Sequence, residues 1–178
     1  HLVKKIMVLI FPDFPKFQPD LTPYEMFNAG IIGGSYFRNI TSPKTNITYT
    51  SNDYKKIKFL HKIPKFKLIT QNYDSNINKF KVKAGSSYED WINKNWIDET
   101  TAPRGWIEWY CHFYNGNRTL DDERQIKRWI NFASKNSGRF RIRFQNIITK
   151  ENKNTLECHP VLQQNLLEWA VDSRKMKP

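Results

Sequence analysis

The feature that most constrains this chain is a run of aromatic residues between Pro103 and Gly116. Its members recur at intervals of three and four, which is the period of one face of an α-helix. They are Trp106, Trp109, Tyr110, Phe113 and Tyr114. Such a face has to be buried, since each ring removes roughly 150–250 Å² from water. The same rings could stack on nucleic-acid bases, but burial explains their spacing better. The run therefore predicts a core helix that opens at Pro103 and stops near Gly116.

Two helix-start signals precede the aromatic run. Thr22–Glu25 places Thr at the cap, Pro at the first position and Glu at the third, and this helix should end near Gly30. Ser86–Glu89 has the form of a second capping box, and its helix is expected to reach about Asn95. Both segments therefore predict short helices.

Three more helices are expected after the aromatic run. Thr119 with acidic residues behind it predicts a start, since acids favour the positive end of the helix dipole, and Gly138 is the expected end. Residues 139–150 leave two alternatives, because apolar residues alternate with arginine as in a strand but also fit a helical spacing. We favour the helix, which accounts for more residues. The last helix is expected to open at Pro160.

The first half of the chain gives weaker signals. Residues 1–20 contain several prolines, which favour an extended strap, and Phe11, Phe14 and Phe17 are expected to pack it along the domain surface. Residues 41–70 are rich in Ser, Thr, Asn and Lys. Within them, Lys55–Leu60 and Phe66–Thr70 are either short strands or irregular segments.

No long linker rich in Pro, Gly or Ser divides the 178 residues, and the expected connections between helices are short. The sequence therefore predicts one compact, mainly α domain over residues 1–178. Its N-terminal half is expected to be less regular and rich in lysine. The apolar run Ile6–Phe11 is too short for a signal peptide core or a membrane span, so we expect an intracellular protein, nuclear or cytoplasmic, that contacts no membrane.

The net charge of +12 favours an acidic partner such as nucleic acid. Residues 1–85, 86–138 and 139–178 carry net charges of +9, −1 and +4, so the excess lies at the two ends of the chain. An AT-rich coding genome would enrich Lys, Asn and Ile together, as seen here. Arginine is more informative than lysine, because such a bias does not favour it.

The arginines and their neighbours are the candidate nucleic-acid contacts, since a guanidinium group binds phosphate through two parallel hydrogen bonds. The candidates are Arg38, Arg104, Arg118, Arg124, Lys127, Arg128, Arg139, Arg141 and Arg143. The alternative for Arg124 and Arg128 is pairing with the acidic residues 121–123 on a solvated helix face. Tyr36, beside Arg38 in a glycine-flanked loop, is a candidate for exposed stacking on a base.

Candidate catalytic residues are few. Glu108 lies among the aromatic residues, and burial there would raise the pKa of its carboxyl group. Asp122 and His112 are further candidates. The alternative is that Glu108 faces solvent and that the aspartate caps a helix. Gly33-Gly34 is only a weak signal for a phosphate-binding loop, and no established catalytic motif is present.

The sequence predicts no metal site, no cofactor and no disulfide. Cys111-His112 and Cys158-His159 are two Cys-His pairs, but zinc needs suitable geometry from several ligands. Adjacent residues on a helix point about 100° apart, so Cys111 and His112 cannot readily share an ion. Two cysteines are also too few for a scaffold held together by disulfides.

Four segments together resemble a family of small uncharacterised proteins. They are Glu25–Arg38 (EMFNAGIIGGSYFR), Gly105–Cys111 (GWIEWYC), Asp121–Trp129 (DDERQIKRW) and Leu166–Ala170 (LLEWA). The resemblance runs from about residue 12 to about residue 172. It implies no activity and no catalytic residues, because the family has no assigned function.

The charge and the arginines favour nucleic-acid binding, to DNA or RNA, as the leading hypothesis. One alternative is a hydrolase that acts on nucleic acid, either a nuclease or a base-excising enzyme. The other is a protein-interaction module whose basic charge reflects genome composition alone.

Overall fold

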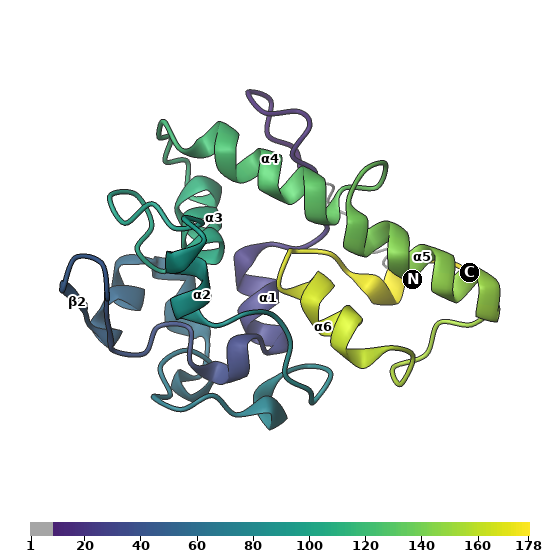
Figure 1. Cartoon of the computed structure of the whole chain (residues 1–178), viewed down its shortest axis with the longest axis horizontal. Coiled ribbons are helices and arrows are strands. Elements are labelled where there is room, and N and C mark those ends of the chain that lie inside the picture. Colours follow the sequence, from purple (N-terminus) through teal and green to yellow (C-terminus); the bar gives the residue numbers. More distant parts are fainter. Residues whose placement is uncertain (1–8) are drawn as a thin grey trace, which may run out of the picture.

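A computed structural model describes residues 9–178, and it is mainly helical, as the sequence predicts (Figure 1). Helices surround a centre formed by α1 and α3, with α4 and α5 in line along one side and α6 beneath them (Figure 1). Their bounds are α1 Pro23–Ala29, α2 Tyr88–Asn93, α3 Trp106–Tyr114, α4 Asp122–Ala133, α5 Arg139–Glu151 and α6 Pro160–Leu167.

The start of α1 follows the predicted capping box. The Thr22 hydroxyl accepts from the Glu25 amide at 3.1 Å, and the Glu25 carboxylate accepts from the Thr22 amide at 2.7 Å. The helix ends at Gly30, whose φ of 102° lies where glycine is favoured. A Cβ at Gly30 would lie 2.1 Å from the carbonyl oxygen of Ile77, so this helix end has room only for a residue without a side chain.

Helix α2 begins one residue later than predicted. Its capping box joins Ser87 to Asp90 rather than Ser86 to Glu89. The sequence Ser-Ser-Tyr-Glu-Asp offers both registers, and the one adopted buries Tyr88 and Ile92. The helix is consequently short and ends before Asn95.

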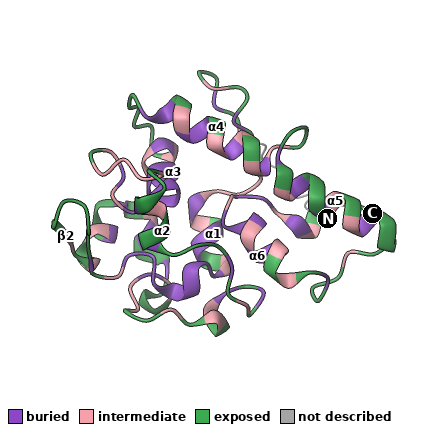
Figure 2. Cartoon of the chain, viewed as in Figure 1, coloured by how far each residue is buried: buried purple, intermediate pink, exposed green. Residues whose placement is uncertain are grey.

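Helix α3 confirms the predicted core helix. Trp106, Trp109, Tyr110 and Phe113 are all buried, and Figure 2 shows α3 as mostly buried with intermediate positions. The helix begins after Gly105 rather than at Pro103. The aromatic face of α3 is therefore part of the core.

The N-terminal strap enters this core. Phe17 is fully buried, and its ring centroid lies between 5.1 and 6.3 Å from five aromatic rings of α3 and α4, besides that of Phe11 at 5.4 Å. Four of these rings are on α3 and the fifth is Trp129 on α4. The expectation that Phe17 packs on the surface is therefore wrong, because its ring fills the space between two helices. Residues 1–8 of the predicted strap lie outside the described residues.

Helices α4 and α5 are separate, and Gly138 lies at the start of α5 rather than at the end of α4. A Cβ at Gly138 would come within 2.4 Å of the Ser134 amide nitrogen, so the two helices meet closely there. The favoured helix over residues 139–150 is confirmed, and it buries Phe144 and Ile148. Pro160 opens α6 as predicted.

For Lys55–Leu60 and Phe66–Thr70 the structure supports the irregular alternative and not the short strands. Residues 51–67 form consecutive 3₁₀ turns, and the small antiparallel sheet joins β1 (Ile40–Thr41) to β2 (Thr48–Tyr49). The apolar residues of this segment recur at every third position, which is the period of a 3₁₀ helix. This spacing places buried side chains at Tyr54, Ile57, Leu60 and Ile63. Among residues 9–178, every helix is too short or too polar to cross a membrane.

Candidate functional site

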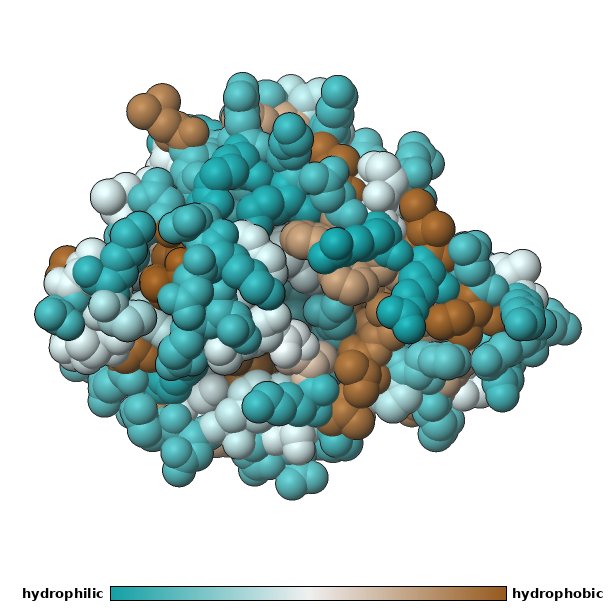
Figure 3. Space-filling view, viewed as in Figure 1, coloured by the Kyte–Doolittle hydropathy of each residue, from teal (hydrophilic) through white to brown (hydrophobic). Residues whose placement is uncertain are grey.

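A cavity of about 270 Å³ opens between α2 with its following loop and the ends of α4, α5 and α6. We call it the tryptophan cavity, because four indole side chains line it. They are Trp91, Trp96, Trp106 and Trp169. Its volume is near the lower end of the roughly 300–1,000 Å³ of small-molecule sites, which suits one planar group. Figure 3 shows a recess near the middle of this face, bordered by hydrophilic side chains.

One wall of the cavity is a continuous series of aromatic rings. The ring centroids of Trp106 and Trp169 are 4.9 Å apart, and those of Trp169 and Phe132 are 4.8 Å apart. Phe140 extends the series, with its centroid 5.5 Å from that of Phe132. These residues come from α3, α4, α5 and the turn after α6, so the wall fixes four parts of the chain together.

The opposite wall carries Trp96, which two arginines of α4 hold in place. The Trp96 carbonyl oxygen accepts from Nη1 of Arg124 at 3.2 Å and from Nη1 of Arg128 at 3.0 Å. The guanidinium carbon of Arg128 lies 5.4 Å from the Trp96 ring centroid and 5.5 Å from that of Trp169. Arg128 therefore bridges the two walls by cation–π contacts. Burial lowers its pKa to about 10, so it remains a cation at neutral pH.

Exposed cations form the rim of the cavity. Nζ of Lys94 lies 4.7 Å from the centroid of Trp96, and the guanidinium carbon of Arg139 lies 4.3 Å from that of Phe132. Within residues 9–178, no ion pair joins Lys94, Arg128 or Arg139 to an acidic side chain. Their charges are therefore not neutralised by the described part of the chain.

One acidic side chain lines the cavity. Glu168 is 7% exposed, and its Oε1 accepts from the Ile32 amide at 3.1 Å and from Nε2 of Gln164 at 3.2 Å. Burial raises the pKa of Glu168 to about 7. Ile32 adopts a φ of 49°, which a β-branched residue rarely does, so the backbone is strained where it binds Glu168.

The glycine loop next to Ile32 is not a phosphate-binding loop. The Gly33 amide donates to Oδ1 of Asn78 at 2.8 Å, and the Gly34 amide donates to the Ile31 carbonyl at 3.1 Å. A Cβ at Gly33 would lie 2.6 Å from the ring of Tyr73, so the glycines allow close packing. The loop amides are therefore already bound within the protein.

Three of the predicted arginines, Arg104, Arg128 and Arg139, line the cavity. Arg104 is 1% exposed, and its guanidinium group binds Asp53 at 2.7 Å and the carbonyl oxygens of Arg38 and Thr50. The prediction that Arg104 grips phosphate is wrong, because its side chain is buried and both Nη1 and Nη2 already donate to groups of the protein.

Tyr36 is also buried, at 3% exposed, so the prediction of an exposed stacking ring is wrong. Its hydroxyl donates to the Arg104 carbonyl at 2.7 Å and accepts from the Glu108 amide at 2.8 Å. It thereby fixes the first turn of α3 against the glycine loop, which explains why a tyrosine follows the glycines.

Other predicted contacts are paired elsewhere. Arg118 pairs with Asp13 at 2.6 Å, and the buried Arg141 pairs with Asp20 at 3.2 Å. Arg124 pairs with Asp121 on its own helix, as the alternative interpretation predicts. Arg38 is half-buried and donates to the Ser35 carbonyl. Lys127 and Arg143 are exposed, and no ion pair engages either one within the described residues.

The three candidate catalytic residues lie outside the cavity lining. Glu108 is buried rather than facing solvent, and burial raises its pKa to about 7, with Nη1 of Arg104 3.7 Å from its carboxylate. Asp122 accepts from the Trp109 indole at 2.8 Å and from the Thr119 amide at 2.9 Å. Both of its carboxylate oxygens are thus bound at the start of α4. His112 is half-buried, and burial lowers its pKa.

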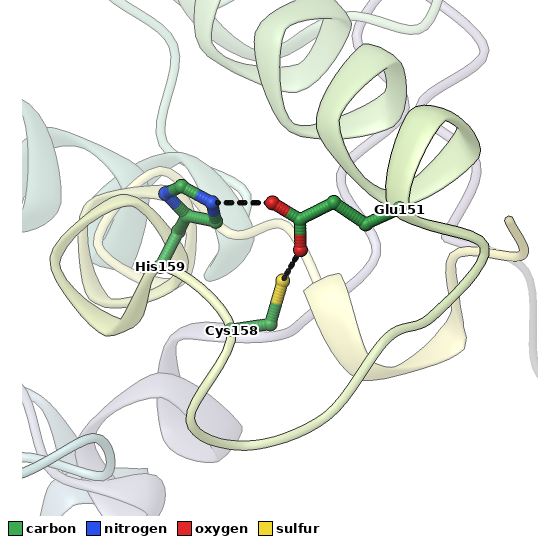
Figure 4. A group of neighbouring side chains, drawn as sticks. All are labelled: Glu151, Cys158 and His159. Atoms are coloured by element: carbon green, nitrogen blue, oxygen red, sulfur yellow. Dashed lines mark hydrogen bonds and ion pairs between the residues drawn. The ribbon is translucent and has the colours of Figure 1, made fainter.

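Glu151, Cys158 and His159 form the group best suited to hold a metal ion among the described residues (Figure 4). Oε1 of Glu151 lies 3.2 Å from Nε2 of His159, and Oε2 lies 3.6 Å from Sγ of Cys158. Cys111 and His112 are adjacent on a helix and point about 100° apart, but this geometry does not apply to Cys158 and His159. Cys158 and His159 precede α6, and the left-handed backbone of His159 lets both side chains reach one carboxylate. Cys111 and Cys158 are both free thiols.

Lys94, Glu168 and three of the cavity tryptophans are not among the residues predicted from the sequence. The available signal was the tryptophan count, since four of six tryptophans line the cavity. No protein family, curated protein or solved structure matches the chain. The function is therefore argued from the geometry of the tryptophan cavity.

Proposed function

We propose that the chain binds nucleic acid by taking one unpaired base into the tryptophan cavity. The observation that carries the proposal is the meeting of four indole side chains with three cations that have no acidic partner in residues 9–178. Stacking of a base on an aromatic ring contributes about 1–3 kcal/mol. Lys94, Arg128 and Arg139 would then contact the phosphates on either side of the base.

The charges select this ligand over two others that an aromatic cavity can hold. A quaternary ammonium group suits an aromatic cage, but four cationic side chains line this one and would repel it. A purely apolar ligand would cover Glu168 and Arg128 without pairing either charge, at a desolvation cost. A nucleotide supplies a planar face, polar edges and an anionic backbone together.

The geometry also favours single strands over duplexes. A base in a duplex is stacked on both faces and paired along its edge, so it enters a cavity only after being unstacked and unpaired. That step costs a few kcal/mol, and a single strand avoids most of it. We therefore expect weaker binding to a duplex of the same sequence and length.

Anisotropy titrations with labelled single-stranded DNA and RNA at several salt concentrations test the proposal. We expect saturable binding that weakens as salt rises, and a loss of at least about tenfold in affinity for Arg139→Ala. Lys150→Ala is the matched control, because Lys150 is exposed on α5 but lies outside the cavity lining. No binding at low salt, or equal losses in both variants, would overturn the proposal.

A base-excising hydrolase is a second candidate, and the buried carboxyl group in the cavity is the observation that favours it. A carboxyl group whose pKa is about 7 can give or take a proton at neutral pH. Incubation of labelled oligonucleotides followed by alkaline cleavage detects excised bases. Excision that is lost in Glu168→Gln and kept in Glu108→Gln would support this activity, and an absence of any excision rejects it.

A further inference from the structure

We infer that Glu168 makes the tryptophan cavity selective for bases that carry an exocyclic amino group, namely cytosine, adenine and guanine, over uracil and thymine. This rests on the proposed function and specifies which bases that site accepts. Aromatic walls stack on any base, so they do not discriminate. Selectivity therefore depends on the polar groups at the edge of the cavity.

The carboxylate of Glu168 has one oxygen already bound and one available. Oε1 accepts two hydrogen bonds, from the Ile32 amide and from Nε2 of Gln164. Among residues 9–178, no hydrogen-bond donor reaches Oε2. A Cβ built on Gly85 would lie 3.5 Å from Oε2, and Gly85 is itself exposed in the cavity lining. The second oxygen therefore lies beside an exposed glycine of the cavity lining.

The two bonds to Oε1 also fix the orientation of the carboxylate. Gln164 lies one helical turn before Glu168, and its Nε2 also donates to the Gly30 carbonyl at 3.1 Å. Ile32 belongs to the strained glycine loop. Because α6 and this loop both hold Oε1, Oε2 already points in one direction before a ligand binds. Binding of a base therefore costs little conformational freedom of the protein.

In assays above about pH 8 the Glu168 carboxyl group is ionised and can only accept, so it selects among bases by the groups at their edges. Cytosine, adenine and guanine each present an amino group that donates to it, and an acidic side chain accepting from cytosine N4 is an established pairing. Uracil and thymine present a carbonyl oxygen where cytosine has its amino group. That oxygen would face the carboxylate and repel it, and Oε2 would be left buried without a partner.

A comparison of oligo(dC) with oligo(dU) of equal length tests the inference, because the two bases differ at the 4-position. We expect wild-type protein to bind oligo(dC) at least about tenfold more tightly. Glu168→Gln should reduce the ratio to about threefold or less, since an amide can also donate to a carbonyl oxygen. Glu108→Gln makes the same chemical change at another buried carboxyl outside the cavity, and it should keep the wild-type ratio.

A modified ligand tests the inference on wild-type protein alone, so the result does not depend on whether a variant folds. Oligonucleotides of N4,N4-dimethylcytosine lack the amino hydrogens, and wild-type protein should bind them as weakly as oligo(dU). Equal binding of oligo(dC) and oligo(dU), or an unchanged ratio in Glu168→Gln, would overturn the inference and leave the proposed function standing. Failure to bind any single strand at low salt would overturn both.

Discussion

Glu108 and Glu168 are the residues whose ionisation matters most for the folded state. Burial raises the pKa of each carboxyl group to about 7, whereas the ordinary value is 4.5. Between these two pH values the folded state holds more protons than the unfolded state. Stability must therefore fall as pH rises from about 4.5 to about 7, and it should level off above that range. This direction is opposite to that of a carboxylate held by a salt bridge.

The first prediction concerns Glu168 and pH. The free energy of unfolding should decrease by up to about 3 kcal/mol per buried carboxyl between pH 5 and pH 8, as measured by urea denaturation. Glu168→Gln should remove the part due to Glu168, because an amide does not ionise. The variant should thus gain stability relative to wild type as pH rises. A variant with the same pH slope as wild type would show that Glu168 does not titrate near neutrality.

The second prediction separates structural arginines from those of the proposed binding site. Arg104→Ala should lower the free energy of unfolding by about 3–5 kcal/mol, because it leaves the carboxylates of Asp53 and Glu108 without their buried partner. Arg139→Ala, on the exposed rim, should change it by less than about 1 kcal/mol. Thermal and urea unfolding of both variants measure this. Equal costs would mean that Arg104 contributes no more to folding than a surface residue.

At the scale of helices and strands, the sequence predicts those features that signals within a few residues determine. The Thr22 capping box, the aromatic spacing of α3 and Pro160 each act within a few residues, and each prediction is confirmed. The start of α2 was wrong by one residue, since two capping registers were available and tertiary packing chose between them. The 3₁₀ turns were missed, although their spacing of three could have been found.

The cavity could not be predicted in the same way. Its two walls come from Trp91 and Trp96 on one side and from Trp169 and the α4–α5 junction on the other. No local pattern relates segments that lie so far apart in the chain. Arg104 and Tyr36 show the converse problem, because a buried arginine or tyrosine cannot be told from an exposed one without the surrounding fold.

The third prediction concerns the junction between α4 and α5. Gly138→Ala should destabilise the protein by about 1–3 kcal/mol, because the added Cβ would press on backbone atoms of Ala133 and Ser134. It should also weaken oligonucleotide binding, since this junction places Phe132 beside Phe140 and brings Arg139 to the rim. Lys135→Ala, an exposed change in the same turn, is the control for both measurements. A fully stable Gly138→Ala would show that the two helices can separate freely.

For the whole molecule, the net charge of +12 is a poor guide to the number of phosphates bound. Most of the excess lies in the lysine-rich first half of the chain, whereas the rim has three cations. For single strands, each neutralised phosphate contributes about −0.7 to the slope of log K against log salt. The rim alone would therefore give a slope of about −2.

The fourth prediction follows from that slope. Titrations between 50 and 200 mM salt should give about −2 for wild type, and removing Lys94 or Arg139 should make the slope shallower by about 0.7. A slope several times steeper would mean that the lysines of the first half also contact the strand, as in a general basic surface. The measurement thus distinguishes a local site from attraction by the total charge.

The burial of Phe17 has a consequence for how the protein is made. Its ring packs against α3 and Trp129, which are synthesised long after the strap itself. At roughly 5–20 residues per second, Phe17 stays without its partners for on the order of 10 s while the chain emerges from the ribosome. Its neighbour Phe11 likewise cannot contact Phe113 until α3 has been synthesised. During translation the strap is therefore an exposed apolar segment, open to chaperones, until α4 has been completed.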